Sequence, residues 1–483
     1  MKVLFLNPPF LGKFSRTSRS PAITRGGTIY YPFWLAYAIG VLDREGFKID
    51  VIDAPAEGYN SAEVIEKAIR IQPQLIVIDT STPSIYSDVK TAEALKDVLP
   101  AAFIVLVGTH PSALPEETLK LSEKLDAVAK GEYDYTIRDL ARCLSNGDDL
   151  KNVDGLIFRK DEQIFYNKPR SLIENPDELP FVSQVYNKYL NIKNYFFAAS
   201  DYPMVMIITG RGCPFKCFFC LYPQTFHSRK YRFRSPKNVV DEFEYIVKNL
   251  PEVKEIGIED DTFTANPQRV QKICQLILER KIKIKWYCNV RADLEAETMN
   301  WMKKAGCQLM TIGFESANQQ ILNNIHKNIR VEQIKEFVKN ARKAGILVHG
   351  CFMAGNPGET KETLQEMLNF AKELNTDTMQ FYPLLVYPGT EAYRWAKEKG
   401  YLLTQDYSKW ATEGGGYNCL LNFPNLSADE ILDFCRRATK EYYLRLPYIL
   451  MKIKQIIFNP TEIRRTTRGA ITFFKQTFLT KRY

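Results

Sequence analysis

Three cysteines fall within eight residues, and their spacing points to metal chemistry. Cys213, Cys217 and Cys220 form a C-x3-C-x2-C pattern, which supplies three thiolates and no fourth. A closed zinc site or an ordinary 4Fe-4S site takes four protein ligands. A 4Fe-4S cluster on three thiolates keeps one iron open to a small molecule. The spacing therefore predicts a reactive cluster rather than a structural one.

A structural clip is the alternative. The chain has seven further cysteines, and one of them could complete a zinc or structural iron–sulfur site. Four of the seven fall in apolar helix or strand patterns, where a free cysteine is usually a small core residue: Cys274, Cys288, Cys307 and Cys351.

Polar residues follow several predicted strands in the second half of the chain. Carboxylates such as Glu259, Asp260 and Glu315 could accept hydrogen bonds from an ammonium or hydroxyl groups, and Arg291 could hold a carboxylate. Gly355 would let a backbone amide approach a ligand closely. Helix capping is the alternative role for any one of them.

The first 145 residues alternate strand and helix, and the strands are nearly all apolar. This pattern predicts a Rossmann-like parallel sheet covered on both faces, with ligands at the carboxyl ends of its strands. Neither G-x-G-x-x-G nor a Walker A motif is present. The predicted strand ends carry Asn7, Thr80, Gly108, Thr109, His110, Gly131 and Glu132.

The βα alternation restarts near residue 200 with six strand candidates, which predicts a partial (β/α)6 barrel of the TIM type. We expect an α/β protein with four segments. These are the Rossmann-like domain (1–145), a connector with a hairpin (146–195), the barrel (196–400) and a helical, basic C-terminal extension (401–483).

The basic charge is concentrated at the C-terminal end. Residues 441–483 hold nine Lys or Arg and two acidic residues, a net +7 of the chain's +9. This localisation makes a general nucleic-acid surface unexpected. Apolar residues recur there at helical spacing among lysines, which is typical of a helix on an anionic membrane or of a terminal helix packed on the barrel: Ile449, Leu450, Ile453, Ile456, Ile457, Ile471, Phe474 and Phe478.

The cysteine motif, with Phe219 before its last cysteine, resembles the hallmark of radical S-adenosylmethionine (SAM) enzymes. The resemblance implies a 4Fe-4S cluster whose open iron binds SAM and cleaves it by one-electron reduction. It further implies SAM contacts at Phe219, Glu259, Asp260, Arg291, Glu315 and Gly355, and no catalytic residue is assigned beyond the cluster ligands.

The first domain resembles the cobalamin-binding domain that precedes many radical SAM domains. The matching pieces are V-G-T-H-P-S-A-L-P-E-E from Val107 and G-E-Y-D from Gly131. The resemblance implies cobalamin at the seven strand-end residues given above. The D-x-H-x-x-G motif, which supplies histidine to cobalt, is absent. We therefore expect cobalamin without a histidine on the metal, and His110 near the corrin edge or in a capping role.

The closest resemblance is to the group that includes hopanoid-modifying enzymes and the anaerobic magnesium-protoporphyrin ester cyclase. We expect methylation or alkylation of an unactivated carbon in a hydrophobic, lipid-like substrate. Cyclisation, oxidation or adenosyl addition on a lipid or tetrapyrrole, and a non-catalytic cobalamin and iron–sulfur sensor, are the alternatives. A reductant such as flavodoxin or ferredoxin is expected. Ten cysteines without disulfide-like spacing and the absence of a leader predict a cytoplasmic protein, with possible peripheral membrane contact through 441–483.

Overall fold

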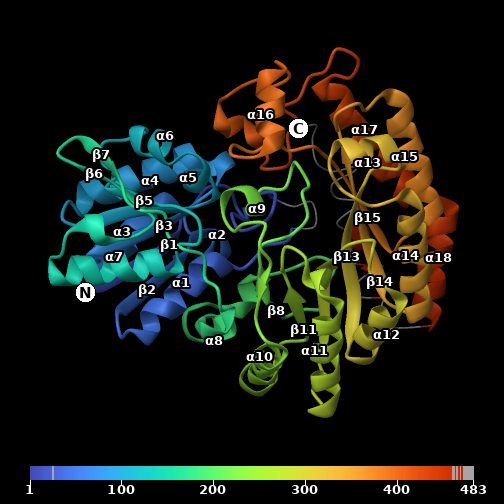
Figure 1. Cartoon of the computed structure of the whole chain (residues 1–483), viewed down its shortest axis with the longest axis horizontal. Coiled ribbons are helices and arrows are strands. Elements are labelled where there is room, and N and C mark those ends of the chain that lie inside the picture. The colour runs from blue at the N-terminus through green and yellow to red at the C-terminus, as the bar shows by residue number, and fades with distance from the viewer. Residues whose placement is uncertain (24–26, 459–462, 464–465, 468, 472–483) are drawn as a thin grey trace.

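The chain folds around two sheets that lie side by side (Figure 1). The computed structural model describes residues 1–23, 27–458, 463, 466–467 and 469–471. The first sheet has seven strands in the order β2-β1-β3-β4-β5-β6-β7, and the second has six in the order β15-β14-β13-β12-β11-β8. The expected α/β architecture, with a parallel-sheet domain followed by a partial barrel and helices at the C-terminal end, is confirmed.

The first five strands of the first sheet are parallel. Every residue of β3 is buried, as expected for a strand covered on both faces. Helices α1 and α7 contact each other on one face, and α3 and α4 contact each other on the other. The bounds are β1 Lys2–Asn7, α1 Phe33–Arg44, β2 Lys48–Asp53, α3 Ser61–Ile71, β3 Leu75–Thr80, α4 Ile85–Val98, β4 Phe103–Gly108, α5 Thr109–Ala113, α6 Pro115–Lys120, β5 Ala127–Ala129 and α7 Asp134–Asn146.

The hairpin expected in the connector is part of this sheet. Strand β6 (Leu156–Lys160) pairs antiparallel with β5, and β7 (Gln163–Tyr166) pairs with β6. Asp161 and Glu162 form the two-residue turn with φ of 49° and 62°, the left-handed backbone of a tight hairpin. The hairpin thus extends the amino-terminal sheet beyond residue 145, and α8 (Val182–Tyr189) lies between the two sheets along the chain.

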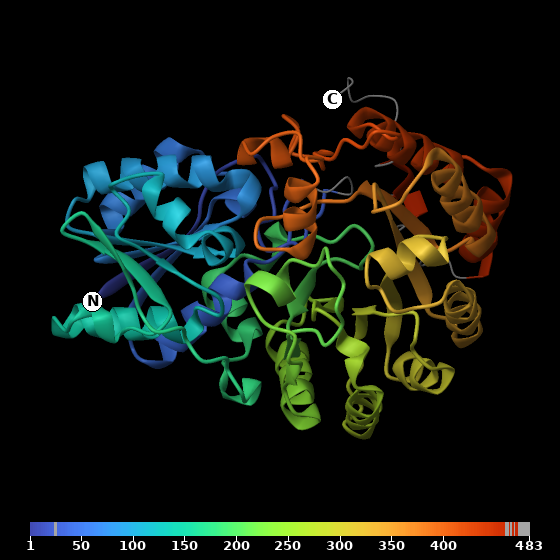
Figure 2. The same ribbon diagram turned by 45° about the horizontal axis from the view of Figure 1, so that its top comes forward.

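The second sheet is parallel throughout, and its strands follow chain order. Its helices lie on the outer face of the curved sheet (Figure 2). The bounds are β8 Met204–Ile207, α10 Pro236–Asn249, β11 Glu255–Ile258, α11 Pro267–Glu279, β12 Lys285–Val290, α12 Ala296–Lys304, β13 Cys307–Glu315, α13 Gln319–Asn324, α14 Val331–Ala344, β14 Leu347–Ala354, α15 Lys361–Leu374 and β15 Thr378–Pro383.

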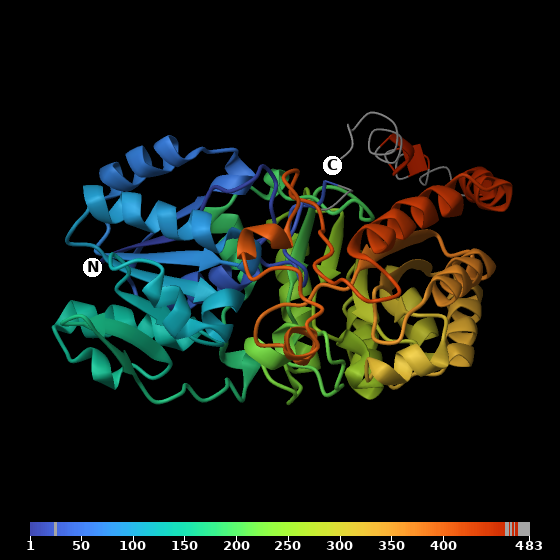
Figure 3. The same cartoon turned by 90° about the horizontal axis from the view of Figure 1, so that it is seen from above.

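The segment after the barrel returns to the first domain. Helix α16 (Glu391–Glu398) is followed by a 3-10 turn, η6 (Tyr407–Trp410), which packs on η1 (Thr82–Ser84) beyond β3. The Tyr407 hydroxyl donates to Glu117 at 2.7 Å. This orange segment lies between the two sheets when the molecule is seen from above (Figure 3).

Helices α17 (Ala428–Tyr443) and α18 (Leu446–Phe458) end the described C-terminal part. Among the described residues, none of the helices combines the length and hydropathy that a bilayer crossing needs. The helical pattern expected around Ile449–Ile457 is confirmed by α18. Phe474 and Phe478 lie outside the described residues.

Candidate functional site

The three cysteines lie on the loop between β9 (Gly210–Arg211) and α9 (Tyr222–Thr225). Gly212 opens the loop at φ 83°, and a Cβ there would stand 2.3 Å from the Lys230 carbonyl, so only glycine fits. The Cys213 N–H donates to the Ser228 carbonyl at 3.2 Å. The Gln224 amide donates to the Phe218 and Cys220 carbonyls at 2.9 and 2.8 Å. These bonds fix the loop backbone that carries the thiols.

Each thiol has a different cation in its surroundings. Burial raises the pKa of Cys213 to about 11, and Arg291 opposes this. Burial also raises the pKa of Cys220, and Arg19 opposes it. Although burial lowers the pKa of Lys327, the charges of Glu315 and then Cys217 raise it overall. A cluster bound by three thiolates carries negative charge, which these cations complement.

The donor set therefore fits a three-thiolate cluster. All ten cysteines are free, so no disulfide competes for the three thiols. No three His, Cys, Asp or Glu side chains in the described part of the chain are gathered closely enough to hold a metal ion. A cluster would have to draw the thiols of this loop together.

Arg291 and Phe219 lie against this loop, as the sequence predicts. The Arg291 guanidinium stacks 3.5 Å from the Phe215 ring centroid, and it donates to the Lys327 carbonyl at 3.0 Å. The Lys327 ammonium lies 6.0 Å from the Phe219 ring centroid. Arg291 thus ties the cysteine loop to the loop after α13. Its assignment to SAM stays a prediction.

Glu315, at the end of β13, forms a buried ion pair that the sequence did not reveal. Its carboxylate accepts from Lys327 Nζ at 2.8 Å and from the Tyr382 hydroxyl at 3.1 Å. Glu315 has φ of 66°, an uncommon backbone for a residue other than glycine. Backbone strain of this kind clusters at functional sites, so its position supports the predicted ligand role. No sequence pattern marks Lys327.

Glu259 is buried and held by three donors. Tyr287 and Asn289, on β12, donate to its carboxylate at 2.9 and 3.0 Å. Arg19 pairs with the same carboxylate at 3.2 Å and also donates to the Glu259 carbonyl at 2.8 Å and to the Asp260 carbonyl. Arg19 comes from the segment between β1 and α1, and nothing in its sequence context marks it.

Asp260 and Gly355 have protein partners of their own. The Asp260 carboxylate accepts from the Thr209 N–H and hydroxyl at 2.5 and 2.6 Å. The Gly355 N–H donates to the buried Glu359 carboxyl. A SAM contact by either group would require these bonds to open. Their assignments stay predictions, and the structure gives both a role in holding strand ends together.

Asp261, the next residue, faces His227 beside the cysteine loop. His227 Nδ1 lies 3.2 Å from its carboxylate, and the Gly212 N–H donates to the same oxygen at 3.2 Å. Burial opposes ionisation, but the His227 contact lowers the pKa of Asp261. The His227 ring meets Trp34 of the first domain edge to face at 4.5 Å. This pair links the cysteine loop to α1.

The carboxyl edge of the first sheet has buried polar atoms without a partner among the described residues: Asp79 Oδ2, Thr109 Oγ1, His110 Nε2 and Tyr133 Oη. Burial raises the pKa of Asp79 to about 7 and lowers that of His110 to about 3. Native buried polar groups are usually hydrogen-bonded. The edge therefore fits a ligand rich in amide groups, such as cobalamin.

The predicted cobalamin residues occupy this edge but differ in their availability. Asn7 donates to Asp53 at 2.8 Å, and the Thr80 hydroxyl donates to the Val107 carbonyl at 2.7 Å. Gly108 has φ of 114°, and a Cβ would stand 2.2 Å from the Thr80 carbonyl. The His110 ring packs edge to face on Tyr407 at 4.7 Å. Thr109 and His110 have side-chain atoms without a partner among the described residues, whereas the side chains of Asn7 and Thr80 are hydrogen-bonded within the first domain.

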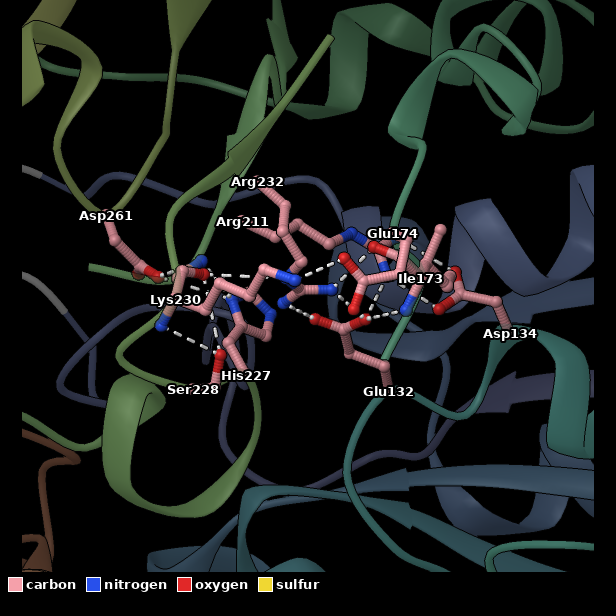
Figure 4. Close-up of polar contacts among 11 residues, drawn as sticks. Glu132, Asp134, Ile173, Glu174, Arg211, His227, Ser228, Lys230, Arg232 and Asp261 are labelled. Atoms are coloured by element: carbon pink, nitrogen blue, oxygen red, sulfur yellow. Dashed lines mark hydrogen bonds and ion pairs between the residues drawn. The ribbon is translucent and has the colours of Figure 1, made fainter. Parts of the chain in front are cut away.

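Glu132, which follows Gly131, joins the two domains instead of lying free at the sheet edge. Arg232 donates to both of its oxygens at 2.8 and 2.5 Å (Figure 4). Arg211 makes a bidentate pair with Asp134 at 2.7 and 2.9 Å. Burial opposes ionisation, but Arg232 and Arg211 hold the pKa of Glu132 at about 2. Two buried arginines from the barrel domain thus bind acids of the first domain at this part of the interface.

Family models match both domains. The model of the radical SAM superfamily matches residues 207–371, and the model of the B12 binding domain matches residues 19–141. These ranges contain the cysteine loop and most of the carboxyl edge of the first sheet, respectively.

Relatives cover almost the whole chain. An uncharacterised methyltransferase of Pyrococcus horikoshii is 31% identical over 478 residues, 99% of each chain. The anaerobic magnesium-protoporphyrin IX monomethyl ester cyclase of Cereibacter sphaeroides is 26% identical, over 92% of this chain and 71% of its own. The solved radical SAM methyltransferase TsrM of Kitasatospora setae, with cobalamin and a 4Fe-4S cluster bound, superposes with a TM-score of 0.70 at 16% identity, covering 91% and 88% of the two chains.

The resemblance proposed from the sequence is therefore confirmed, and the chain is an enzyme of the radical SAM kind. It belongs to the radical SAM superfamily, in the group that carries a B12 binding domain and uses a 4Fe-4S cluster, SAM and cobalamin.

Proposed function

We propose that this enzyme transfers a methyl group from SAM to an unactivated carbon of its substrate. The contact between the two cofactor regions carries the proposal. Helix α9, which directly follows the cysteine loop, packs on α5, which follows β4 of the B12 binding domain. The Tyr222 hydroxyl donates to the Thr17 carbonyl at 2.6 Å, and a Cβ on Gly131 would lie 3.5 Å from the Phe226 carbonyl. The cysteine loop and the carboxyl edge of the first sheet are therefore in direct contact.

When bound, the three cofactors supply one-electron cleavage of SAM and carriage of a methyl group. The protein would hold the three cofactors at the contact between its two domains and exclude water from them. Cys213, Cys217 and Cys220 would hold the cluster, and Arg291 and Lys327 would balance its charge. Arg19, Arg211 and Arg232 fix the two domains in register. The likeness to a methyltransferase over 99% of the chain favours methyl transfer over cyclisation.

The test is anaerobic incubation with methyl-deuterated SAM, dithionite and extract of host cells, followed by mass spectrometry. Methyl transfer predicts deuterium in a product together with 5′-deoxyadenosine. Cyclisation or oxidation predicts 5′-deoxyadenosine with no deuterium in any product. A sensor predicts neither. A variant with all three loop cysteines changed to alanine is the control and should yield neither. In cells, a one-electron donor such as flavodoxin or ferredoxin would replace dithionite.

A second proposal concerns membrane contact, and the exposed face of α18 favours it. One face of this helix docks on the loop before β15, where the Tyr448 hydroxyl donates to the Asp377 carbonyl at 2.9 Å. The opposite face exposes apolar side chains at helical spacing: Leu446, Ile449, Leu450, Ile453, Ile457 and Phe458. Lys454 is also exposed on this helix.

Flotation with liposomes tests this contact. The full chain should float with vesicles that contain anionic lipid and remain behind with neutral vesicles. The variant Leu450→Glu with Ile457→Glu should lose flotation, whereas Leu403→Glu, an exposed leucine outside α18, should retain it. Equal flotation of all three proteins would refute the contact.

A further inference from the structure

The inner face of the last three barrel strands is the feature from which we argue. The outer faces of β14 and β15 pack against helices through aromatic residues. Phe352 meets Phe370 of α15, and Phe381 meets Phe434 of α17. Within each strand, the residues next to these phenylalanines point to the inner face, because successive side chains of a strand alternate between its two faces. The pattern of exposure follows this alternation.

The inward residues are half-exposed although helices cover the outer face of the sheet. In β14 the exposure alternates so that His349 and Cys351 are half-exposed between buried neighbours, and in β15 Thr378 and Gln380 behave in the same way. Thr311 and Gly313 are the corresponding half-exposed residues of β13. Barrel interiors are normally filled by layers of bulky branched side chains. In β13, β14 and β15 the inward side chains are instead partly exposed.

The strand register aligns these residues in two rows across the sheet. Asn289 pairs with Thr311, Thr311 with His349, and His349 with Thr378, which gives one row of four polar residues. The next row toward the carboxyl ends joins Gly313, Cys351 and Gln380. Neither row contains a charged or a branched aliphatic residue.

The polar row includes one hydroxyl group without a hydrogen-bond partner in the described part of the chain. His349 Nδ1 lies 2.8 Å from the Thr378 hydroxyl, and Gln380 contacts the same ring. Burial lowers the pKa of His349 to about 4, so its imidazole is neutral at neutral pH. Thr311 Oγ1 is buried and has no partner in the described part of the chain. An unpaired buried polar atom is destabilising, and a ligand can remove that cost by hydrogen bonding to it.

Aromatic residues flank the two rows along the strands, with Tyr382 toward the carboxyl ends and Tyr287 toward the amino ends. The Tyr382 ring lies 6.1 Å from that of Tyr417, which comes from the segment after the barrel. The Tyr287 ring lies 4.8 Å from that of Phe197, which precedes β8. The acid at this level, Glu315, is already paired with Lys327. The surface thus combines neutral hydrogen-bonding groups with the half-exposed ring of Tyr382, whereas Tyr287 is fully buried.

We propose that this inner face binds the substrate, and that the part of the substrate inside the barrel is compact, uncharged and hydrogen-bonding. A hydroxylated, amide-bearing or heteroaromatic molecule supplies a partner for Thr311 beside the neutral His349 ring, and its flat body packs on Tyr382. A long acyl chain leaves the Thr311 hydroxyl unpaired and covers a polar row, and it is excluded on that ground. This inference rests on the proposed function, because it takes the methylated carbon to belong to the bound substrate. The test of the substrate class does not require a methylated product.

The experiment uses the reconstituted enzyme, dithionite and deuterated SAM, with the aqueous and organic fractions of a host-cell extract as the two probes. The first readout is stimulation of 5′-deoxyadenosine formation, which requires a bound substrate but no methyl transfer. We expect the aqueous fraction to stimulate it and the organic fraction to have no effect. Stimulation by the organic fraction alone, or by neither fraction, would overturn the substrate class. Aqueous stimulation without deuterium in any product would keep the substrate class and refute methyl transfer.

Two substitutions at one position separate recognition from folding. His349→Gln keeps a neutral hydrogen-bonding side chain, whereas His349→Leu has similar bulk and cannot hydrogen-bond. We expect His349→Leu to lose about tenfold of the stimulated 5′-deoxyadenosine, and His349→Gln to stay within about threefold of the wild type. Both variants should retain the iron content and the urea midpoint of the wild type, which separates a loss of recognition from a loss of folding. Equal stimulation in both variants and the wild type would exclude a role for this row.

Discussion

Arg19 and Glu259 connect the two cofactor-binding domains directly. The guanidinium comes from the B12 binding domain and pairs at 3.2 Å with a carboxylate at the carboxyl end of β11 in the barrel. The same guanidinium donates to the carbonyls of Glu259 and Asp260. Its pKa is raised, because the carboxylates of Glu259 and Asp261 outweigh the effect of burial. Arg19 thus positions the acidic strand end that the sequence assigns to SAM.

Replacing Arg19 with alanine should weaken SAM binding and the domain interface. The change leaves the buried Glu259 carboxylate and two carbonyls with fewer donors, which should lower the free energy of unfolding by about 1–3 kcal/mol. Urea denaturation and calorimetric titration with SAM measure the two effects. Arg70→Ala removes an exposed pair with Glu66 and serves as the control, with an expected change within about 0.5 kcal/mol. Equal denaturation midpoints for the two variants would contradict the prediction.

Replacing Lys327 with methionine should be more damaging, because the change leaves Glu315 buried without its cation. Breaking a buried pair of this kind costs about 3–5 kcal/mol. Tyr382 alone would then donate to the Glu315 carboxylate. The double variant Lys327→Met with Glu315→Gln should recover part of the loss, because it removes the unpaired charge. Denaturation midpoints of the three proteins test this order. A double variant less stable than Lys327→Met would contradict it.

The cysteine loop was predictable from the sequence, because three thiols within eight residues need no tertiary information to be recognised. The parallel strands were predictable for the same kind of reason, since β3 and β4 are continuous apolar runs between turn residues. The hairpin at Asp161 was also expected. Its membership of the first sheet was not, because strand pairing depends on contacts that local pattern does not encode.

The cations around the site could not be predicted in this way. Arg19, Lys327 and Arg232 are distant in sequence from the acids that they pair with, and basic residues are common on protein surfaces. His227 and Asp261 are likewise 34 residues apart. The availability of Asp260 was equally hidden, because the fold brings its partner Thr209 from 51 residues away. Gly355 is bonded locally by Glu359, four residues on, but its spacing does not show that this bond forms. Sequence spacing identified strand ends, but it could not show which groups were already satisfied.

The three loop cysteines should behave as one set in metal binding. Changing any one of them to alanine removes a third of the ligands, so bound iron and the EPR signal of the reduced cluster should fall sharply. Cys274→Ala is the matched control, because Cys274 is fully buried on α11, away from the loop. Iron analysis after anaerobic reconstitution measures the difference. Iron retained in the Cys217→Ala variant, or zinc in the wild type, would contradict the assignment.

Glu359 should make stability depend on pH in the direction opposite to that of a carboxylate whose pKa is lowered by an ion pair. Burial raises its pKa to about 8, although the Asn356 and Gly355 N–H groups favour the ionised form. From about pH 4.5 to pH 8 the unfolded chain therefore loses a proton that the folded protein keeps. The contribution of Glu359 to stability is present in full below pH 4.5 and declines as the pH rises to 8.

The variant Glu359→Gln keeps an acceptor for the two amides and cannot ionise, so it should lack this decline. Relative to the wild type, its urea midpoint should rise steadily between pH 5 and pH 8. Glu362→Gln, a change at an exposed glutamate in the first turn of α15, should follow the wild type closely. Parallel curves for wild type and Glu359→Gln would mean that Glu359 is ionised in the folded protein. Its Oε1, which has no partner among the described residues, would then be a buried unpaired charge. Such a charge is far more costly than the protonated acid, which is why we expect the curves to diverge.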